Sequence, residues 1–244
     1  MFDNFEQTQI HTNGAIIHLA KKGDGFPLLL LHGYPQTHVM WHKIAPRLAQ
    51  EYTVVAADLR GYGDSSKPEG GPDHYNYSKR AMAQDLVETM HQLGYREFFV
   101  VGHDRGGRVA HRMALDHPQQ VKKLAVLDIA PTYTMYMTAD KAFATVYYHW
   151  FFLIQPYDLP ERLISSQLEY YLRRCLTSWS ADPAAFAPEA MADYLRCFSN
   201  PATIHATCED YRAAATIDLQ HDEADLNQKV TCPLLVLWGE KGFV

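Results

Sequence analysis

Residues 98–108 constrain the fold of this chain more than any other stretch, because they predict a strand, a tight turn and a helix in immediate succession. Four apolar or aromatic residues, 98–101, are typical of a short buried strand. A turn centred on Asp104 follows, and a helical pattern then runs to the residues before Pro118. Gly102 and Gly106 let strand and helix close on each other around a strained backbone. The pattern predicts a sharp bend that presents the side chain of Asp104.

Asp104 is predicted to be a nucleophile. The bend places it at the N-terminus of a helix, where exposed N–H groups and the helix dipole favour negative charge, so we expect it to be ionised. A carboxylate can attack carbon without first losing a proton, whereas a serine would need a base. The alternative is that Asp104 only caps its own helix, but the flanking glycines and the apolar strand before it fit a cap poorly.

Apolar runs that suit buried parallel strands alternate with helical patterns along the chain. The strands are expected at residues 27–31, 52–57, 98–101, 124–129 and 233–239, and the helices at 41–50 and 78–94. Asn13-Gly14 between two strand-like runs is the signature of a two-residue hairpin. The expected fold class is therefore α/β, with a doubly wound, mostly parallel sheet.

The pattern changes between residue 132 and about residue 225, where helix-like segments rich in aromatic residues and arginine replace the apolar strands. We expect residues 1–131 to form the first part of the α/β core and 132–225 to form a helical cap inserted into it. Residues 226–244 resume the core, which we expect to be incomplete at the C-terminus.

Composition argues against several classes of partner. Acidic residues outnumber basic ones by 28 to 22 without a basic run, so nucleic acid is not expected. The N-terminus does not resemble a signal peptide and no apolar run would cross a bilayer, so we expect no membrane partner and a cytoplasmic location. The four cysteines form no C-x-x-C pair, and H-E-x-x-H is absent. We expect reduced cysteines, no metal and no cofactor.

Several motifs resemble, in order along the chain, those of the α/β hydrolases and more narrowly of the haloacetate (fluoroacetate) dehalogenases. They lie at residues 32–36, 58–65, 102–108, 127–133, 148–150 and 208–213. The first two are shared by many α/β hydrolases, whereas the arginines after the nucleophile and the later His-Trp pair and tyrosine are strongly specific. The resemblance implies hydrolysis of a small haloacid to glycolate and halide through an aspartyl ester, by a homodimer.

Arg105 and Arg108 are predicted to bind the carboxylate of the substrate. They lie three residues apart on the first turns of the predicted helix, so they share a face. Guanidinium groups suit carboxylates, and an uncharged haloalkane would leave these charges unpartnered in a desolvated pocket. The alternative is that one or both arginines form ion pairs with Asp104 or with a surface acid.

The resemblance also implies roles for residues further along the chain. His149, Trp150 and Tyr211 match the family's halide pocket, where donors would stabilise the leaving halide. Asp128, at a strand end, matches the acid that steers the catalytic histidine. Glu240 is the alternative acid, since other α/β hydrolases place theirs after the last visible strand.

We expect the backbone N–H groups of Tyr34 and Arg105 to form the oxyanion hole for ester hydrolysis. In the family the catalytic histidine follows a further strand and helix, and this sequence stops at Val244. The expectation is that the chain forms the ester without turning over, and that it exposes apolar surface where that strand and helix would pack.

Two other functions stay open. An epoxide hydrolase shares the aspartate, but that family calls for two cap tyrosines and usually an aromatic residue after the nucleophile, where this chain has Arg105. Haloalkane dehalogenases place tryptophan there. A non-catalytic α/β hydrolase that binds a small acid is the other alternative, because the histidine is missing.

Overall fold

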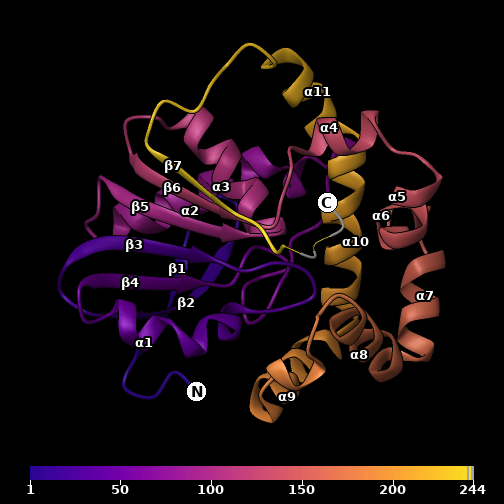
Figure 1. The fold of residues 1–244 in the computed structure, drawn as a ribbon, viewed down its shortest axis with the longest axis horizontal. Coiled ribbons are helices and arrows are strands. Elements are labelled where there is room, and N and C mark those ends of the chain that lie inside the picture. The colour runs from indigo at the N-terminus through magenta and orange to yellow at the C-terminus, as the bar shows by residue number, and fades with distance from the viewer. Residues whose placement is uncertain (241, 243–244) are drawn as a thin grey trace.

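The computed structural model describes residues 1–240 and 242, apart from the side chain of Pro183. Its centre is a seven-stranded sheet in the order β1-β2-β4-β3-β5-β6-β7 (Figure 1). The pairs among β3 to β7 are parallel, whereas β1 and β2 form an antiparallel hairpin that joins β4 antiparallel. The α/β class with a mostly parallel sheet is confirmed. The strands are β1 (Glu6–His11), β2 (Ile16–Lys22), β3 (Phe26–Leu31), β4 (Tyr52–Ala57), β5 (Phe98–His103), β6 (Val121–Leu127) and β7 (Leu234–Leu237).

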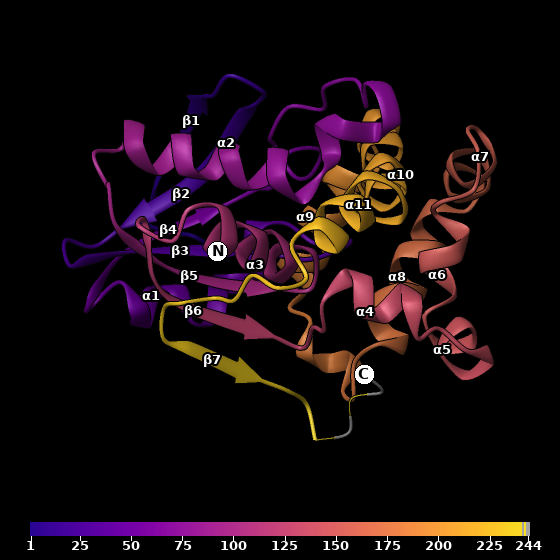
Figure 2. The same cartoon turned by 90° about the horizontal axis from the view of Figure 1, so that it is seen from above.

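Helices cover both faces of the sheet, as Figure 2 shows. On β3, Leu29 and Leu31 belong to the core that includes the apolar side of α2 and α3, whereas Leu28 and Leu30 pack on the other face with Trp41 and α1. This alternation is the two-residue period of a strand buried on both sides. The elements concerned are η1 (His38–Lys43), α1 (Ala45–Leu48), η2 (Pro72–Tyr77), α2 (Lys79–Gln92) and α3 (Arg105–Asp116).

The chain between β6 and β7 is helical and lies beyond the carboxyl ends of the central strands (Figure 1). In both views α10 lies between the sheet and the helices α5, α6 and α7. The set is α4 (Thr132–Met137), α5 (Lys141–Val146), α6 (Tyr148–Phe152), α7 (Leu159–Ser166), α8 (Leu168–Ser178), η3 (Pro183–Ala185), α9 (Pro188–Phe198), α10 (Pro201–Ala215) and α11 (Ile217–Ala224).

Two predicted elements differ from the structure. The single helix expected at 41–50 is wrong, because the 3-10 helix η1 ends at Lys43 and the short α1 begins at Ala45. Pro46 explains the break, since a proline is tolerated in the first turn of a helix but not in its interior. The strand expected at 124–129 begins earlier, at Val121, and ends at Leu127. The next residue, Asp128, adopts a φ of 54°, which is outside the range of a strand. Within the described residues, no helix has the length and apolarity needed to cross a membrane.

Candidate active site

The bend between β5 and α3 presents Asp104, which lies between the last residue of the strand and the first residue of the helix with a φ of 47° and a ψ of −117°. Positive φ is unfavourable for a residue with a Cβ and is found where the surroundings impose it. A Cβ on Gly102 would lie 2.4 Å from the carbonyl oxygen of Gly106, and a Cβ on Gly106 would lie 2.4 Å from that of His32. Both glycines are therefore required for the strand and helix to meet at this bend.

The carboxylate of Asp104 is held by one backbone donor and one cation. Its Oδ1 accepts a hydrogen bond from the backbone N–H of Tyr34 at 2.8 Å, and its Oδ2 lies 3.4 Å from Nη1 of Arg108. Burial acts to raise the pKa of Asp104, but the positive charges of Arg108 and Arg105 outweigh it and hold the pKa below its ordinary value. Asp104 is therefore an anion at neutral pH, as a carboxylate nucleophile must be.

Arg105 is completely buried and pairs with Asp210 of helix α10 rather than lying free in the cavity. Its Nε donates to Oδ2 of Asp210 at 2.9 Å, and its Nη2 donates to Oδ1 at 2.7 Å and to the carbonyl oxygen at 2.9 Å. The guanidinium also stacks on the ring of Tyr211, 4.2 Å from its centroid. Nη1 is buried and finds no hydrogen-bond partner in the described part of the chain.

Arg108 lies closer to the carboxylate of Asp104. Its guanidinium is 4.7 Å from the ring centroid of Trp150, and its Nη2 lies 2.8 Å from the sulfur of Met135. Its Nε is buried and lacks a partner among the described residues. Both arginines thus pair with an acid, Arg108 with Asp104 and Arg105 with a buried aspartate that the sequence did not indicate. Each arginine nevertheless has one buried nitrogen, Nη1 in Arg105 and Nε in Arg108, that donates to no described residue.

A small cavity of about 240 Å³ opens above Asp104, smaller than the roughly 300–1,000 Å³ typical of ligand pockets. This size suits a substrate of a few atoms. Of the eight predicted site residues, six line it, while Arg105 and Trp150 lie behind the lining. The described lining consists of Tyr34, His103, Asp104, Arg108, Asp128, Met135, Val146, Tyr147, His149, Trp179, Tyr211 and Gly242.

The three residues predicted to bind halide meet in one aromatic cluster. The ring of Tyr211, on α10, lies 5.8 Å from that of His149 and 6.2 Å from that of Trp150, both on α6. The hydroxyl of Tyr211, Nδ1 of His149 and Nε1 of Trp150 are all buried without a partner in the residues described. Burial lowers the pKa of His149 to about 3, so it is neutral at neutral pH. Unsatisfied buried polar atoms are uncommon, and so many in one cluster are expected where a ligand supplies the missing partner.

Asp128 follows the end of β6 and lines the cavity, whereas Glu240 is not among the described lining residues. The backbone N–H of Asp128 donates to the carbonyl oxygen of Leu237 at 2.9 Å, which links the start of the loop after β6 to β7. The predicted oxyanion hole is represented by the backbone N–H of Tyr34, which already contacts the carboxylate of Asp104. Arg105, the other residue predicted for the oxyanion hole, is the first residue of α3 and directly follows Asp104.

Sequence reasoning did not indicate two residues of this region. Trp179 follows α8, and its ring centroid lies 4.3 Å from that of His149. Asp210 lies within one of the motifs noted in the sequence, at residues 208–213, but no local spacing connects it with Arg105. A buried ion pair between residues so far apart in the chain becomes visible only when the helices are in place.

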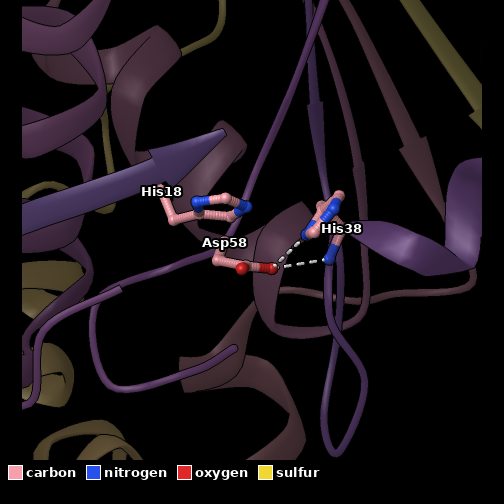
Figure 3. A group of neighbouring side chains, drawn as sticks. All are labelled: His18, His38 and Asp58. Carbon is pink, nitrogen blue, oxygen red and sulfur yellow. Dashed lines mark hydrogen bonds and ion pairs between the residues drawn. The ribbon is translucent and has the colours of Figure 1, made fainter. Parts of the chain in front are cut away.

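A second cluster, of His18, His38 and Asp58, is shown in Figure 3, and its ligand atoms are all within 4.8 Å of one another. None of the three residues is in the described lining of the cavity above Asp104. The carboxylate of Asp58 accepts hydrogen bonds from the backbone N–H of His38 at 2.7 Å, from Nδ1 of His38 at 2.9 Å and from the backbone N–H of Asp64 at 3.0 Å. These donors satisfy both oxygens of Asp58 without a metal ion and join the loops after β3 and β4, whereas Nε2 of His18 is buried without a partner in the described residues.

Comparison with known proteins places these features in context. Residues 27–244 match the family described as the alpha/beta hydrolase fold. The chain is 51% identical over its whole length to a fluoroacetate dehalogenase of Burkholderia sp., covering 81% of that protein, and 37% identical to a soluble epoxide hydrolase of Corynebacterium sp. over 97% of the chain and 81% of the relative. A solved structure from Nostoc sp. PCC 7120, described as an α/β hydrolase, is 71% identical with a TM-score of 0.98, covering 99% of this chain and 83% of that one.

Proposed function

The chain belongs to the α/β-hydrolase family, and within that family we propose that it removes halide from haloacetates through an aspartyl ester. The observation that carries the proposal is the set of buried, unused donors around an ionised aspartate. Arg105 and Arg108 each offer one N–H for a carboxylate, and three aromatic side chains offer donors for a halide. The 51% identity to a fluoroacetate dehalogenase supports the same substrate class.

In the first step, an oxygen of Asp104 attacks the carbon that carries the halogen, the carbon–halogen bond breaks, and the halide leaves with the electron pair. Nη1 of Arg105 and Nε of Arg108 hold the carboxylate of the substrate. Fluoride concentrates its charge on one small atom, so donors placed where that charge develops lower the barrier. We assign this role to Tyr211 and Trp150 with neutral His149.

In the second step, water gives up a proton to a basic histidine and attacks the carbonyl carbon of the ester. The bond from that carbon to the glycolate oxygen then breaks, the oxygen takes up the proton, and glycolate and free Asp104 result. The negative oxygen that forms is stabilised by the backbone N–H groups of Tyr34 and Arg105. We assign to Asp128, which lines the cavity, the role of the acid that orients a basic histidine, as in a catalytic triad.

The proposal includes a helical cap at residues 132–225, inserted between core segments at 1–131 and 226–244. Its support is that α6 and α10, from this segment, supply His149, Trp150 and Tyr211 to the cavity above the bend. The homodimer and the cytoplasmic location stay predictions of the resemblance and of the sequence.

An epoxide hydrolase is the alternative enzyme. Tyr147 and Tyr211 both line the cavity, so the two tyrosines that this family calls for are present, and the Corynebacterium relative is an epoxide hydrolase. An uncharged epoxide, however, would leave the spare donors of the two arginines unpaired in a buried site, which is costly. This cost favours an anionic substrate.

Intact-mass measurement after incubation with chloroacetate tests the proposal. We expect the mass of the protein to rise by one carboxymethyl group while chloride is released, and we expect no adduct with the variant Asp104→Asn. A neutral epoxide tested in parallel should give no adduct. Reversible binding of chloroacetate without any covalent product would instead indicate a small-acid-binding protein.

A further inference from the structure

We propose that Asp210 is a positioning residue that orients Arg105, so that a single guanidinium nitrogen of Arg105 is presented to the carboxylate of the substrate. The inference rests on the proposed function and deepens it. It explains how an arginine that is completely buried and ion-paired can still serve an anion site.

Three hydrogen bonds fix the guanidinium of Arg105. Nε and Nη2 donate to the two carboxylate oxygens of Asp210 at 2.9 and 2.7 Å, and Nη2 also donates to its carbonyl oxygen at 2.9 Å. A planar guanidinium held along one edge has no freedom to rotate. The nitrogen on the opposite side, Nη1, is therefore fixed in direction and is also the one without a partner in the described residues.

Asp210 is itself held in place from the core side. Its Oδ2 accepts a hydrogen bond from the hydroxyl of Tyr62 at 2.6 Å, and its Oδ1 forms an ion pair with Nζ of Lys79. Burial acts to raise the pKa of Asp210, but Arg105 and Lys79 outweigh it and hold the pKa well below the ordinary value. The carboxylate of Asp210 thus remains charged and is held in its position against Arg105.

The network also balances its own charge before any substrate enters. Lys79 lies 3.4 Å from Oδ2 of a second buried acid, Asp218. Two cations, Lys79 and Arg105, thus face two carboxylates, Asp210 and Asp218. This balance of charge allows Arg105 to be buried as a cation. The binding of an anionic substrate by Arg105 therefore depends on the direction of its Nη1 donor rather than on an excess of positive charge.

The contacts of Asp210 with Arg105 and Lys79 link α10 to the helices that pack on the sheet. α10 carries Asp210 and lies beside the carboxyl ends of the strands (Figure 1), whereas Arg105 and Lys79 begin the core helices α3 and α2. A purely structural role for this link predicts that its loss affects all substrates equally. A positioning role predicts that the preference for anions is lost selectively.

The test compares ester formation from chloroacetate with that from chloroacetamide, a neutral molecule of similar size with the same leaving group. The readout is the ratio of the two second-order rate constants, which does not depend on the fraction of folded protein. We expect Asp210→Asn to lower this ratio about tenfold or more, mainly by raising the half-saturating concentration of chloroacetate. Tyr77→Phe is the control, because the hydroxyl of this buried tyrosine donates to the carbonyl oxygen of Pro68 and not to Asp210 or Arg105, and it should change the ratio less than about threefold.

Arg105→Lys provides a second variant in case Asp210→Asn does not fold. Lysine keeps the charge but cannot bind Asp210 along one edge and still aim a further donor, so we expect the ratio to fall about tenfold again. An unchanged ratio in folded Asp210→Asn, with normal ester formation by the unmodified chain, would overturn the role of Asp210 alone. An unchanged ratio in Arg105→Lys would also remove Arg105 from the binding of the substrate carboxylate. Failure of the unmodified chain to form any ester would overturn the proposed function and this inference with it.

Discussion

Asp104 keeps its negative charge in a site where burial alone would favour the neutral acid. Arg108 and Arg105 compensate for that burial and hold the pKa of Asp104 below its ordinary value. Burial has the opposite effect on the charge of His149, because it lowers the pKa of this histidine to about 3 and so keeps it neutral. The site therefore combines a charged nucleophile with a neutral hydrogen-bonding side chain over the same range of pH.

The rate of ester formation should consequently be constant between about pH 5 and pH 8. A lowered pKa keeps Asp104 ionised throughout this range, and a lowered pKa keeps His149 neutral throughout it, so neither group titrates there. The measurement is the initial release of chloride from chloroacetate at a series of pH values. A rate that is half-maximal near pH 6.5 would show instead that a histidine with an ordinary pKa controls the step.

Tyr211→Phe should slow ester formation from fluoroacetate about tenfold and that from bromoacetate less than about threefold. The hydroxyl of Tyr211 is buried without a partner in the described residues, and the small fluoride ion depends most on such donors. Rates of fluoride and bromide release provide the measurement. Tyr170→Phe is the control, because Tyr170 is 69% exposed on α8, outside the cavity lining. Equal losses for the two halides would remove Tyr211 from the halide pocket.

The element that positions Asp104 is the bend from β5 into α3. Gly106 and Gly107, two adjacent glycines at the start of α3, differ in how tightly they are packed. A Cβ on Gly106 would meet the backbone oxygens of His32 and Leu31 at 2.4 and 2.5 Å. A Cβ on Gly107 would meet the oxygen of Gly102 at 3.1 Å, a much milder contact. Backbone atoms cannot move aside as a flexible side chain can, so the first position tolerates only glycine.

Gly106→Ala should therefore lower the free energy of unfolding by about 2–3 kcal/mol and abolish ester formation. Gly107→Ala should change stability by less than about 1 kcal/mol, because the better helix propensity of alanine offsets the closer contact. Urea unfolding followed by circular dichroism measures both variants. If the two lost stability equally, the close approach of α3 to the loop after β3 would not be the reason for Gly106.

At the scale of the whole molecule, the sheet ends in a strand with little cover. Among the described residues β7 pairs with β6 alone, and its residues Leu234, Leu235, Val236 and Leu237 are each about half exposed, at 49–53%. An apolar edge strand with unpaired backbone groups is prone to pair with another chain.

We therefore expect this 244-residue chain to self-associate as its concentration rises, and we expect Val236→Lys to reduce that association. A lysine on an edge strand discourages edge-to-edge pairing because the charge cannot be buried against a second strand. Light scattering over a range of concentrations is the measurement. Leu163→Lys, at a 54% exposed position on α7, is the matched control and should have no such effect. Equal behaviour of the two variants would exclude β7 as the contact.

The sequence by itself determined the features that depend on neighbouring residues. The strand periods, the Asn13-Gly14 hairpin, the helix capped by Ser78 and the bend at Asp104 all follow from patterns only a few residues long. The one helix that was wrongly predicted, 41–50, also has a local cause in Pro46, whose effect on a helix depends on its position within it.

Only the tertiary structure decided how distant segments share the site. The N–H of Tyr34 reaches the carboxylate of Asp104 from 70 residues away, and Asp210 reaches Arg105 from 105 residues away. The sequence indicated Arg105 as a ligand of the substrate but not that another carboxylate would hold most of its guanidinium. Local patterns specify helices and strands, whereas ion pairs between them depend on packing, because the cost of burying a charge is met only where the folded chain brings a partner to it.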